Sequence, residues 1–200
     1  MTDTPKSYTR GKGLLEELLT KKRSDKANSL ISKAHRAGRI LDIGCGSYPY
    51  FLSKTKFNEK YGIDPSLRSK IVGKEKIVLE KFSVGTKKLP YKDDYFDVVT
   101  MLAVFEHIDE KYLNFVLKEI RRILKTNGIL IITTPSPWAD KVLHVMANFY
   151  LISKEEIHEH KHNLTHHKIS DFLVEAGFPV NKIKKGFFEF YMNMWFKAEK

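Results

Sequence analysis

The chain alternates short apolar runs with amphipathic stretches, which is the pattern of strands alternating with helices. Glycine, proline or charged residues bound each apolar run, as is typical of strands buried in a parallel sheet. The stretches between the runs repeat apolar positions every three or four residues, as helices do. We therefore expect five strands at 39–43, 60–64, 77–82, 96–101 and 129–133, with helices at 50–54 and 109–124.

The last part of the chain adds a strand pair to this alternation. Residues 168–176 predict a helix closed by Gly177, and 182–190 and 191–198 predict two final strands. Strands alternating with helices indicate an α/β protein with a doubly wound sheet. We expect seven strands in a mostly parallel, Rossmann-like sheet, with one antiparallel strand at the C-terminal hairpin.

Local signals set the expected helix ends and the domain limits. Residues 14–37 carry apolar positions at helical spacing, and we expect Ser24-Asp25 to break them into two helices. Asp109 has the residue type of an N-cap, and Gly128 stands where a left-handed C-terminal cap requires glycine. The predicted organisation is a helical preamble at 1–37 followed by the main domain at 38–200.

The composition fits a single domain in a reducing compartment. Of the 200 residues 42% are apolar, which is enough for one full core. The chain has no apolar run of about eighteen residues, so we expect no membrane span, and Met1–Lys12 lacks the apolar segment of a secretory signal. Cys45 is the single cysteine, which rules out an intrachain disulfide and favours the cytoplasm.

A net charge of +11 raises the question of an anionic partner. Nucleic acid, a phosphorylated substrate or a membrane surface would each suit such a charge. The lysines are scattered along the chain, without the interleaved aromatic residues of a nucleic-acid groove. This scatter favours a solvated lysine-rich surface over a basic patch.

The strongest chemical signal is a glycine bend that follows the first strand. Asp42 ends the apolar run, and Gly44 and Gly46 allow a sharp turn with bare backbone beside it. Asp64 ends the second strand, and 64 − 44 = 20 residues is the spacing at which a carboxylate meets ribose hydroxyls. A dinucleotide site shares this geometry, but its motif requires a third glycine at position 49, where this chain has Pro49. A nucleoside with a positively charged tail and no phosphate fits better, because Asp42 would repel a pyrophosphate.

These motifs resemble the class I S-adenosylmethionine-dependent methyltransferases, in the type 11/23-like branch that methylates small molecules. The resemblance runs from about Ile40 to about Phe178, so it does not rest on one motif. It is carried by the glycine bend and Asp64, then by segments 89–91, 95–99, 105–108, 121–135 and 175–178. It implies the same seven-stranded sheet and S-adenosyl-L-methionine as cofactor.

The resemblance assigns cofactor contacts along the chain. It implies that Asp42 and the bend hold the methionine end, that Asp64 holds the ribose, and that the segment before Leu89 contacts the adenine. The family usually has an aspartate in that segment, where this chain has Gly85. The residues expected to contact the cofactor are Asp42, Gly44, Cys45, Gly46, Asp64, Pro65, Gly85, Thr86, Leu89, Met101 and Leu102.

Two histidines are candidates for acid–base catalysis. His107 follows the fourth strand in a Glu-His pair, and its pKa range suits a general base; the alternative is a histidine that positions the next turn. The resemblance picks out His160 as a residue facing the acceptor. Relatives that bind a metal carry an acidic residue where this chain has Ala103, and a metal cluster among the histidines of 158–167 is the lesser alternative, so we expect no metal.

The segment 136–165 is an insertion after the fifth strand. Residues 138–157 have apolar positions at helical spacing, which fits an amphipathic helix packed on the core or a lid over the acceptor. A lid of this kind would suit an apolar or lipid-like acceptor. The positive net charge of the protein would suit an anionic acceptor.

The favoured function is methyl transfer to a small molecule, at an oxygen of a sugar, a quinone-like compound or a lipid-linked compound. The alternatives are an RNA or protein methyltransferase and a cofactor-binding partner subunit without activity. Affinity for S-adenosylmethionine without turnover would favour the inactive subunit. RNA binding that weakens steeply with salt would favour the RNA methyltransferase. The sequence leaves the acceptor and the oligomeric state open.

Overall fold

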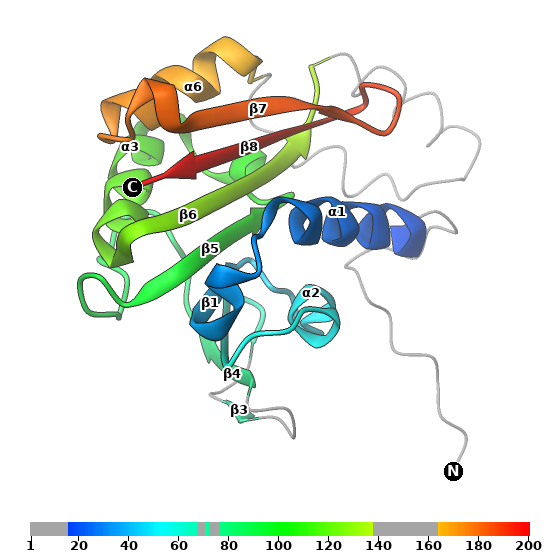
Figure 1. Ribbon diagram of the computed structural model, residues 1–200, viewed down its shortest axis with the longest axis vertical. Helices are drawn as coiled ribbons and strands as arrows, with labels where there is room; N and C mark the ends of the chain where they lie inside the picture. The colour runs from blue at the N-terminus through cyan, green and yellow to red at the C-terminus, as the bar shows by residue number, and fades with distance from the viewer. Residues whose placement is uncertain (1–15, 68–70, 73–76, 138–163) are drawn as a thin grey trace.

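The computed structural model describes residues 16–67, 71–72, 77–137 and 164–200, which form one sheet with helices on both faces (Figure 1). The strands are β1 (Arg39–Ile43), β2 (Glu59–Asp64), β3 (Ile71–Val72), β4 (Ile77–Lys81), β5 (Phe96–Leu102), β6 (Leu124–Pro135), β7 (Ile183–Phe188) and β8 (Asn193–Glu199). The helices are α1 (Glu16–Leu30), α2 (Tyr50–Lys54), α3 (Glu110–Ile123) and α6 (His166–Glu175), with 3₁₀ turns η1 (Ala34–Ala37), η2 (Phe105–His107) and η3 (Val180–Lys182).

The sheet confirms the predicted doubly wound, mostly parallel arrangement. Its order is β3-β4-β2-β1-β5-β6-β8-β7. The pairs within β4-β2-β1-β5-β6 are parallel, whereas β8 runs antiparallel to both β6 and β7. The seven expected strands are present, and the two-residue β3 adds an antiparallel edge beside β4. All parallel strands therefore end at one edge, where ligands bind in such sheets.

Two apolar clusters fix the helices on the sheet. One lies under α1 and α2 and contains Ala27, Phe51 and Leu52 with strand residues such as Ile40. The other lies under α3 and α6 and includes five inward residues of α3 predicted from the helical spacing: Leu113, Val116, Leu117, Ile120 and Ile123. Burying an aliphatic side chain of this size contributes roughly 1.5–3 kcal/mol, so packing decides where the helices lie.

The expected break at Ser24-Asp25 is wrong, because α1 is continuous from Glu16 to Leu30. Serine and aspartate cost at most about 0.7 kcal/mol each inside a helix. Ala27 is fully buried and Ile31 nearly so, and Ser24 itself is buried, so this stretch of the chain packs onto the sheet. Tertiary packing outweighs the local preference for a cap. Ala34, one of the apolar positions within 14–37, is exposed.

The expected role of Gly128 also needs correction. The left-handed residue after α3 is Asn127, with φ 63°. A Cβ on Gly128 would lie 2.8 Å from the Lys125 carbonyl oxygen and 3.1 Å from the Phe96 carbonyl oxygen. Glycine is required here because backbone segments approach closely, while asparagine tolerates the left-handed conformation.

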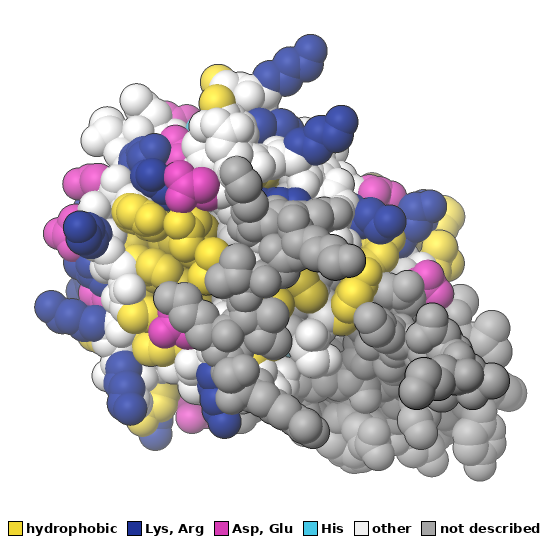
Figure 2. All heavy atoms as spheres, turned by 90° about the horizontal axis from the view of Figure 1, so that it is seen from below, with side chains coloured by type: hydrophobic (Ala, Val, Ile, Leu, Met, Phe, Trp, Pro, Cys, Tyr) yellow, Lys and Arg dark blue, Asp and Glu magenta, His cyan; other side chains and the backbone are white. Residues whose placement is uncertain are grey.

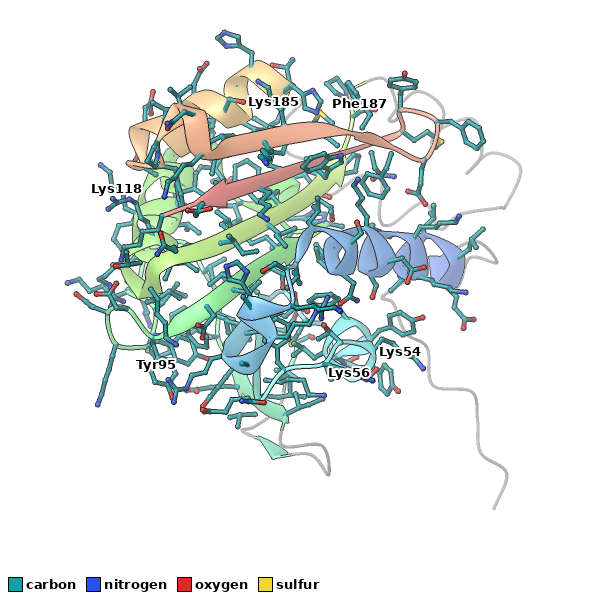
Figure 3. The ribbon with its side chains drawn as sticks, viewed as in Figure 1. Lys54, Lys56, Tyr95, Lys118, Lys185 and Phe187 are labelled. Atoms are coloured by element: carbon teal, nitrogen blue, oxygen red, sulfur yellow. The ribbon has the colours of Figure 1, made fainter. Side chains whose placement is uncertain are left out.

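A carboxylate ties the beginnings of β1, β5 and β6 together, at the edge away from the expected ligand site. Asp97 accepts the Arg39 backbone N–H at 2.7 Å and pairs with the Lys125 ammonium at 2.8 Å. Gly38 leaves room for this carboxylate, because a Cβ at 38 would lie 1.9 Å from Asp97 Oδ2. Figure 3 labels Tyr95 near the same edge of the sheet, and the Arg39 guanidinium lies 4.5 Å from the centre of its ring. Among the described residues, no helix is long and apolar enough to cross a membrane.

We predict that Gly38→Ala lowers the free energy of unfolding by about 1–3 kcal/mol, because the methyl group displaces Asp97 from the Arg39 amide. In an Asp97→Ala background the same change should cost less than about 0.5 kcal/mol, since the clash is gone. Urea denaturation of the four proteins of this cycle measures both values. Equal costs in the two backgrounds would contradict the assigned role of Asp97.

Candidate functional site

The glycine bend lies where β1 ends beside β2. Gly44 and Gly46 have φ of 77° and 70°, values that favour glycine. The Gly44 N–H donates to the Ile63 carbonyl at 2.8 Å, which ties the bend to β2. A Cβ on Gly44 would lie 2.2 Å from Val104 Cγ2, whereas one on Gly46 would have no atom nearer than 3.9 Å. Gly44 is thus needed for packing, and Gly46 leaves its backbone open to a ligand.

Asp64 is bonded to this bend. Its side chain is buried, and Oδ2 accepts the Gly46 N–H at 3.0 Å. Oδ1 accepts the Ser66 N–H at 2.8 Å and also the Ser66 hydroxyl. These bonds hold the carboxylate at the carboxyl end of β2, beside the open backbone of Gly46. Its contact with a ribose stays a prediction, and neighbouring Pro65 is exposed.

Asp42 is the second buried carboxylate at this edge, and it lies on β1 facing Thr100 of β5. The Thr100 hydroxyl donates to Asp42 Oδ1 at 2.6 Å. Burial raises the pKa of Asp42 to about 7; the Thr100 bond opposes the rise and the nearby charge of Asp64 adds to it. Burial removes water from this carboxylate, and the described residues bring no cation among the causes of its pKa, so its environment favours a positively charged ligand.

The chain turns sharply after β5 and presses against the bend. Met101 is fully buried and Leu102 half-buried. Ala103 adopts φ 56°, a left-handed conformation that costs a non-glycine residue roughly 1–2 kcal/mol. Its N–H donates to the Thr133 carbonyl at 2.9 Å, and the next residue, Val104, packs against Gly44. Strain of this kind gathers at functional sites, where packing holds it in place.

The Glu-His pair forms the 3₁₀ turn η2 and its two members differ in burial. Glu106 is buried, and the Thr134 hydroxyl donates to its Oε2 at 3.0 Å. His107 is half-buried, and its backbone N–H donates to the Val104 carbonyl at 3.0 Å. Glu106 therefore anchors the turn to β6, and His107 lies at the more accessible position. No signal in the sequence indicated Thr134, because its contact with Glu106 spans 28 residues.

The expected adenine segment is shaped by backbone conformation. Gly85 is buried with φ 147°, a conformation that residues with a side chain rarely adopt. A Cβ there would meet only Tyr112, at 3.9 Å, so space is available but an aspartate would be strained. This gives a physical reason for the missing acidic residue. Thr86 beside it is exposed.

Leu89 is held by two charged residues of α3 that the sequence analysis missed. Its N–H donates to Glu119 Oε2 at 2.9 Å, and its carbonyl accepts from Arg122 at 3.1 Å. Arg122 also binds the Tyr91 carbonyl at 2.9 Å and lowers the pKa of Glu119. The i, i+3 spacing of Glu119 and Arg122 on one helix was a signal for their pairing, though not for the loop that they hold.

The remaining candidate residues are Cys45 and the histidines of 158–167. Burial, with the charges of Asp42 and Asp64, raises the pKa of the Cys45 thiol, so Cys45 stays protonated and is no nucleophile. His160, the other histidines of 158–163 and the expected lid at 138–157 lie outside the described residues. Among the residues that are described, no group of three or more histidine, cysteine, aspartate or glutamate side chains could hold a metal ion.

Comparison with known proteins agrees with this geometry. Residues 41–132 match the family model described as a methyltransferase domain. The chain is 39% identical over 93 residues to an uncharacterised protein of Methanocaldococcus jannaschii, covering 46% of this chain and 39% of that protein. It is 28% identical over 101 residues to the ubiquinone biosynthesis O-methyltransferase of Pelagibacter ubique, covering 48% and 41% respectively. The matches thus span less than half the length of these relatives.

Two solved structures show the same fold over most of the chain. An S-adenosylmethionine-dependent methyltransferase of Thermotoga maritima matches with a TM-score of 0.68 at 19% identity, covering 94% of this chain and 91% of that one. One from Archaeoglobus fulgidus matches with a TM-score of 0.67 at 20% identity, covering 94% and 98%. The chain therefore has the fold of S-adenosylmethionine-dependent methyltransferases, and a little under half of it, residues 41–132, matches a methyltransferase domain.

Proposed function

We propose that the protein transfers a methyl group from S-adenosylmethionine to a small-molecule acceptor. The observation that carries the proposal is the pair of buried carboxylates, Asp42 and Asp64, on adjacent strands around a glycine bend whose second glycine is open. A buried carboxylate whose pKa is raised fits a ligand with an ammonium group. A second carboxylate held by backbone N–H groups fits a neighbouring pair of hydroxyls.

The residues of the bend fit this cofactor in both shape and charge. Asp42 would neutralise the ammonium of the methionine end, and the backbone of Gly44 to Gly46 would lie along it. Asp64 would accept hydrogen bonds from the ribose, in an orientation that the Gly46 and Ser66 amides already hold. Leu89, Met101 and Leu102 would supply apolar contacts, and Gly85 and Thr86 would lie near the adenine. When bound, the cofactor supplies an electrophilic methyl group on a sulfonium.

The protein's own part in the transfer is to orient the acceptor, exclude water and remove a proton where needed. His107 is our candidate for the base, because η2 holds it past the end of β5 and Thr134 anchors the adjacent Glu106. His160 is proposed as a second residue that faces the acceptor. The strained turn at Ala103 keeps η2 against the bend, so the base and the cofactor site are held by one short segment.

For the acceptor we propose an oxygen on a sugar, a quinone-like compound or a lipid-linked compound. The relative from Pelagibacter ubique carries the name of an O-methyltransferase of ubiquinone biosynthesis, which supports the quinone-like class. We further propose that 136–165 covers the acceptor, as part of the domain at 38–200. An RNA acceptor is disfavoured, because the lysines are scattered along the chain without the interleaved aromatic residues of a nucleic-acid groove. On the face shown in Figure 2, the lysine and arginine side chains of the described residues lie at separate places.

We predict that Asp64→Asn weakens the affinity for S-adenosylhomocysteine by about 10- to 100-fold, because one charge-assisted acceptor of the ribose is lost. Isothermal titration calorimetry measures the change. Asp171→Asn is the matched control, since Asp171 is exposed and bonds the exposed His167 on α6. If Asp64→Asn binds S-adenosylhomocysteine within about twofold of the parent protein, Asp64 does not bind the ribose.

Asp42→Asn should raise the stability of the ligand-free protein and remove its affinity for the cofactor. The pKa of Asp42 is about 7 in the folded protein and 3.8 ordinarily, so the folded state holds an extra proton between these values. This group therefore lowers the free energy of unfolding as the pH rises through that range. We predict that, without ligand, the variant is more stable than the parent at about pH 8 and that the gap narrows toward about pH 5. Calorimetry should show that the variant has lost its affinity for S-adenosylhomocysteine. A constant gap would contradict the raised pKa.

His107→Gln should lower kcat by about 100-fold while leaving cofactor affinity unchanged, because a base acts on the acceptor. The assay follows S-adenosylhomocysteine formed with a panel of catechols, hydroxylated quinones and polyprenyl phenols. His35→Gln is the control, since His35 bonds Ser32 and the Asn127 carbonyl and lies in η1, which leads into the beginning of β1. A kcat reduced less than about threefold by His107→Gln would leave the histidine only a structural role.

A further inference from the structure

The turn that joins β7 to β8 lies at the same edge of the sheet as the glycine bend. β8 is antiparallel to β6 and β7 is antiparallel to β8, so β7 ends where the parallel strands end. The Ser136 N–H donates to the Met192 carbonyl at 2.8 Å and ties the turn to the end of β6. In Figure 1 the turn projects beyond the sheet, above the N-terminal end of α1. This turn is a separate feature from the cofactor site, and no step of the proposed reaction uses it.

The turn presents large apolar side chains to solvent. Phe190 is 93% exposed, Tyr191 is 65% exposed and Phe187 is 41% exposed. The ring centroids of Phe187 and Tyr191 lie 5.2 Å apart, and those of His166 and Phe187 lie 4.2 Å apart. Figure 3 labels Phe187 on β7 next to the turn. An exposed group of aromatic residues of this kind marks an interaction surface.

The backbone of the turn holds these side chains outward at a cost. Glu189, Phe190 and Tyr191 adopt φ of 52°, 52° and 66°, so three successive residues with side chains are left-handed. Each such residue costs roughly 1–2 kcal/mol. The Met192 N–H donates to the Glu189 carbonyl at 3.0 Å, and the Asn193 side chain donates to Glu189 Oε2 at 2.6 Å. The turn is therefore fixed, although the Phe190 side chain gains almost no burial within the chain.

Cations of α1 border this aromatic group. The Lys26 ammonium of α1 lies 4.5 Å from the centre of the Trp195 ring of β8, so this face of α1 borders the strand that follows the turn. Lys22, one helical turn before Lys26, acts electrostatically on the Glu189 carboxylate of the turn. Lys22 is exposed, and Leu18, one helical turn before it, is 50% exposed. The result is a surface with apolar rings at its centre and ammonium groups at its margin. We name it the turn–helix surface: Leu18, Lys22, Lys26, Phe187, Phe190 and Tyr191.

We propose that the turn–helix surface binds the protein to an anionic lipid bilayer. Aromatic side chains favour the boundary between headgroups and acyl chains, and each lysine near an anionic surface contributes about 1 kcal/mol. A protein partner fits less well, because lysine is depleted in protein interfaces. The net charge of +11 acts in the same direction at long range. The proposal does not depend on the proposed methyl transfer.

The test is sedimentation of the full chain with unilamellar vesicles. We expect the protein to sediment with vesicles of equimolar phosphatidylglycerol and phosphatidylcholine. It should stay in the supernatant with vesicles of phosphatidylcholine alone. The double variant Phe190→Ser/Tyr191→Ser should lower the partition coefficient roughly tenfold or more, because two exposed rings no longer insert. Val180→Ser is the matched control: Val180 is 73% exposed but lies in η3, before β7 and at the other edge of the sheet, so binding should not change.

Charge is tested separately from the rings. Lys22→Glu/Lys26→Glu should abolish binding to the anionic vesicles, and about 0.5 M salt should weaken the parent protein's binding. Since all four side chains are exposed or half-exposed, melting temperatures should stay equal to that of the parent. The proposal is overturned if the parent protein stays in the supernatant, or if either double variant sediments as the parent does. Binding of a labelled single-stranded RNA that both double variants lose, without vesicle binding, would assign the surface to nucleic acid instead.

Discussion

The burial of Asp42 is the constraint on which the site depends. This carboxylate lies on a central strand, has one hydroxyl partner in Thr100 and has a second buried carboxylate, Asp64, nearby. A protein selected for stability alone would place an apolar residue there, because burying a charge without a counter-charge is costly. The raised pKa of Asp42 records that cost, and a ligand that brings a positive charge would recover it. The glycine bend adds the second requirement, an open stretch of backbone beside the two carboxylates.

The rest of the fold holds these two strand ends in register. At the opposite edge Asp97 links the beginnings of β1, β5 and β6, and Gly38 makes room for it. At the site edge Val104 packs against Gly44, which couples the turn after β5 to the bend. The strain at Ala103 lies in this coupled segment, so the packing of the two core clusters maintains a backbone that local preference disfavours.

The sequence predicted what depends on local pattern. The bounds of β1 are those expected, and β2, β4 and β5 differ by one residue, because apolar runs and glycines mark buried strands directly. Contacts between distant segments were missed: Thr100 with Asp42, Thr134 with Glu106, and Arg122 with the segment at Leu89. The break expected at Ser24 failed for the same reason, since burial of the helix against the sheet overrides a weak local preference. The turn at Glu189 was expected as a strand end, because three left-handed residues without glycine leave no sequence signal.

The most direct test is to titrate the Asp42 side chain by carbon-13 NMR of the carboxyl group, assigned with Asp42→Asn, with and without S-adenosylhomocysteine. We expect a pKa of about 7 in the free protein and a marked fall on binding, because the ligand's ammonium stabilises the carboxylate. A pKa near the ordinary 3.8 in the free protein, or a raised value that the ligand leaves unchanged, would contradict it.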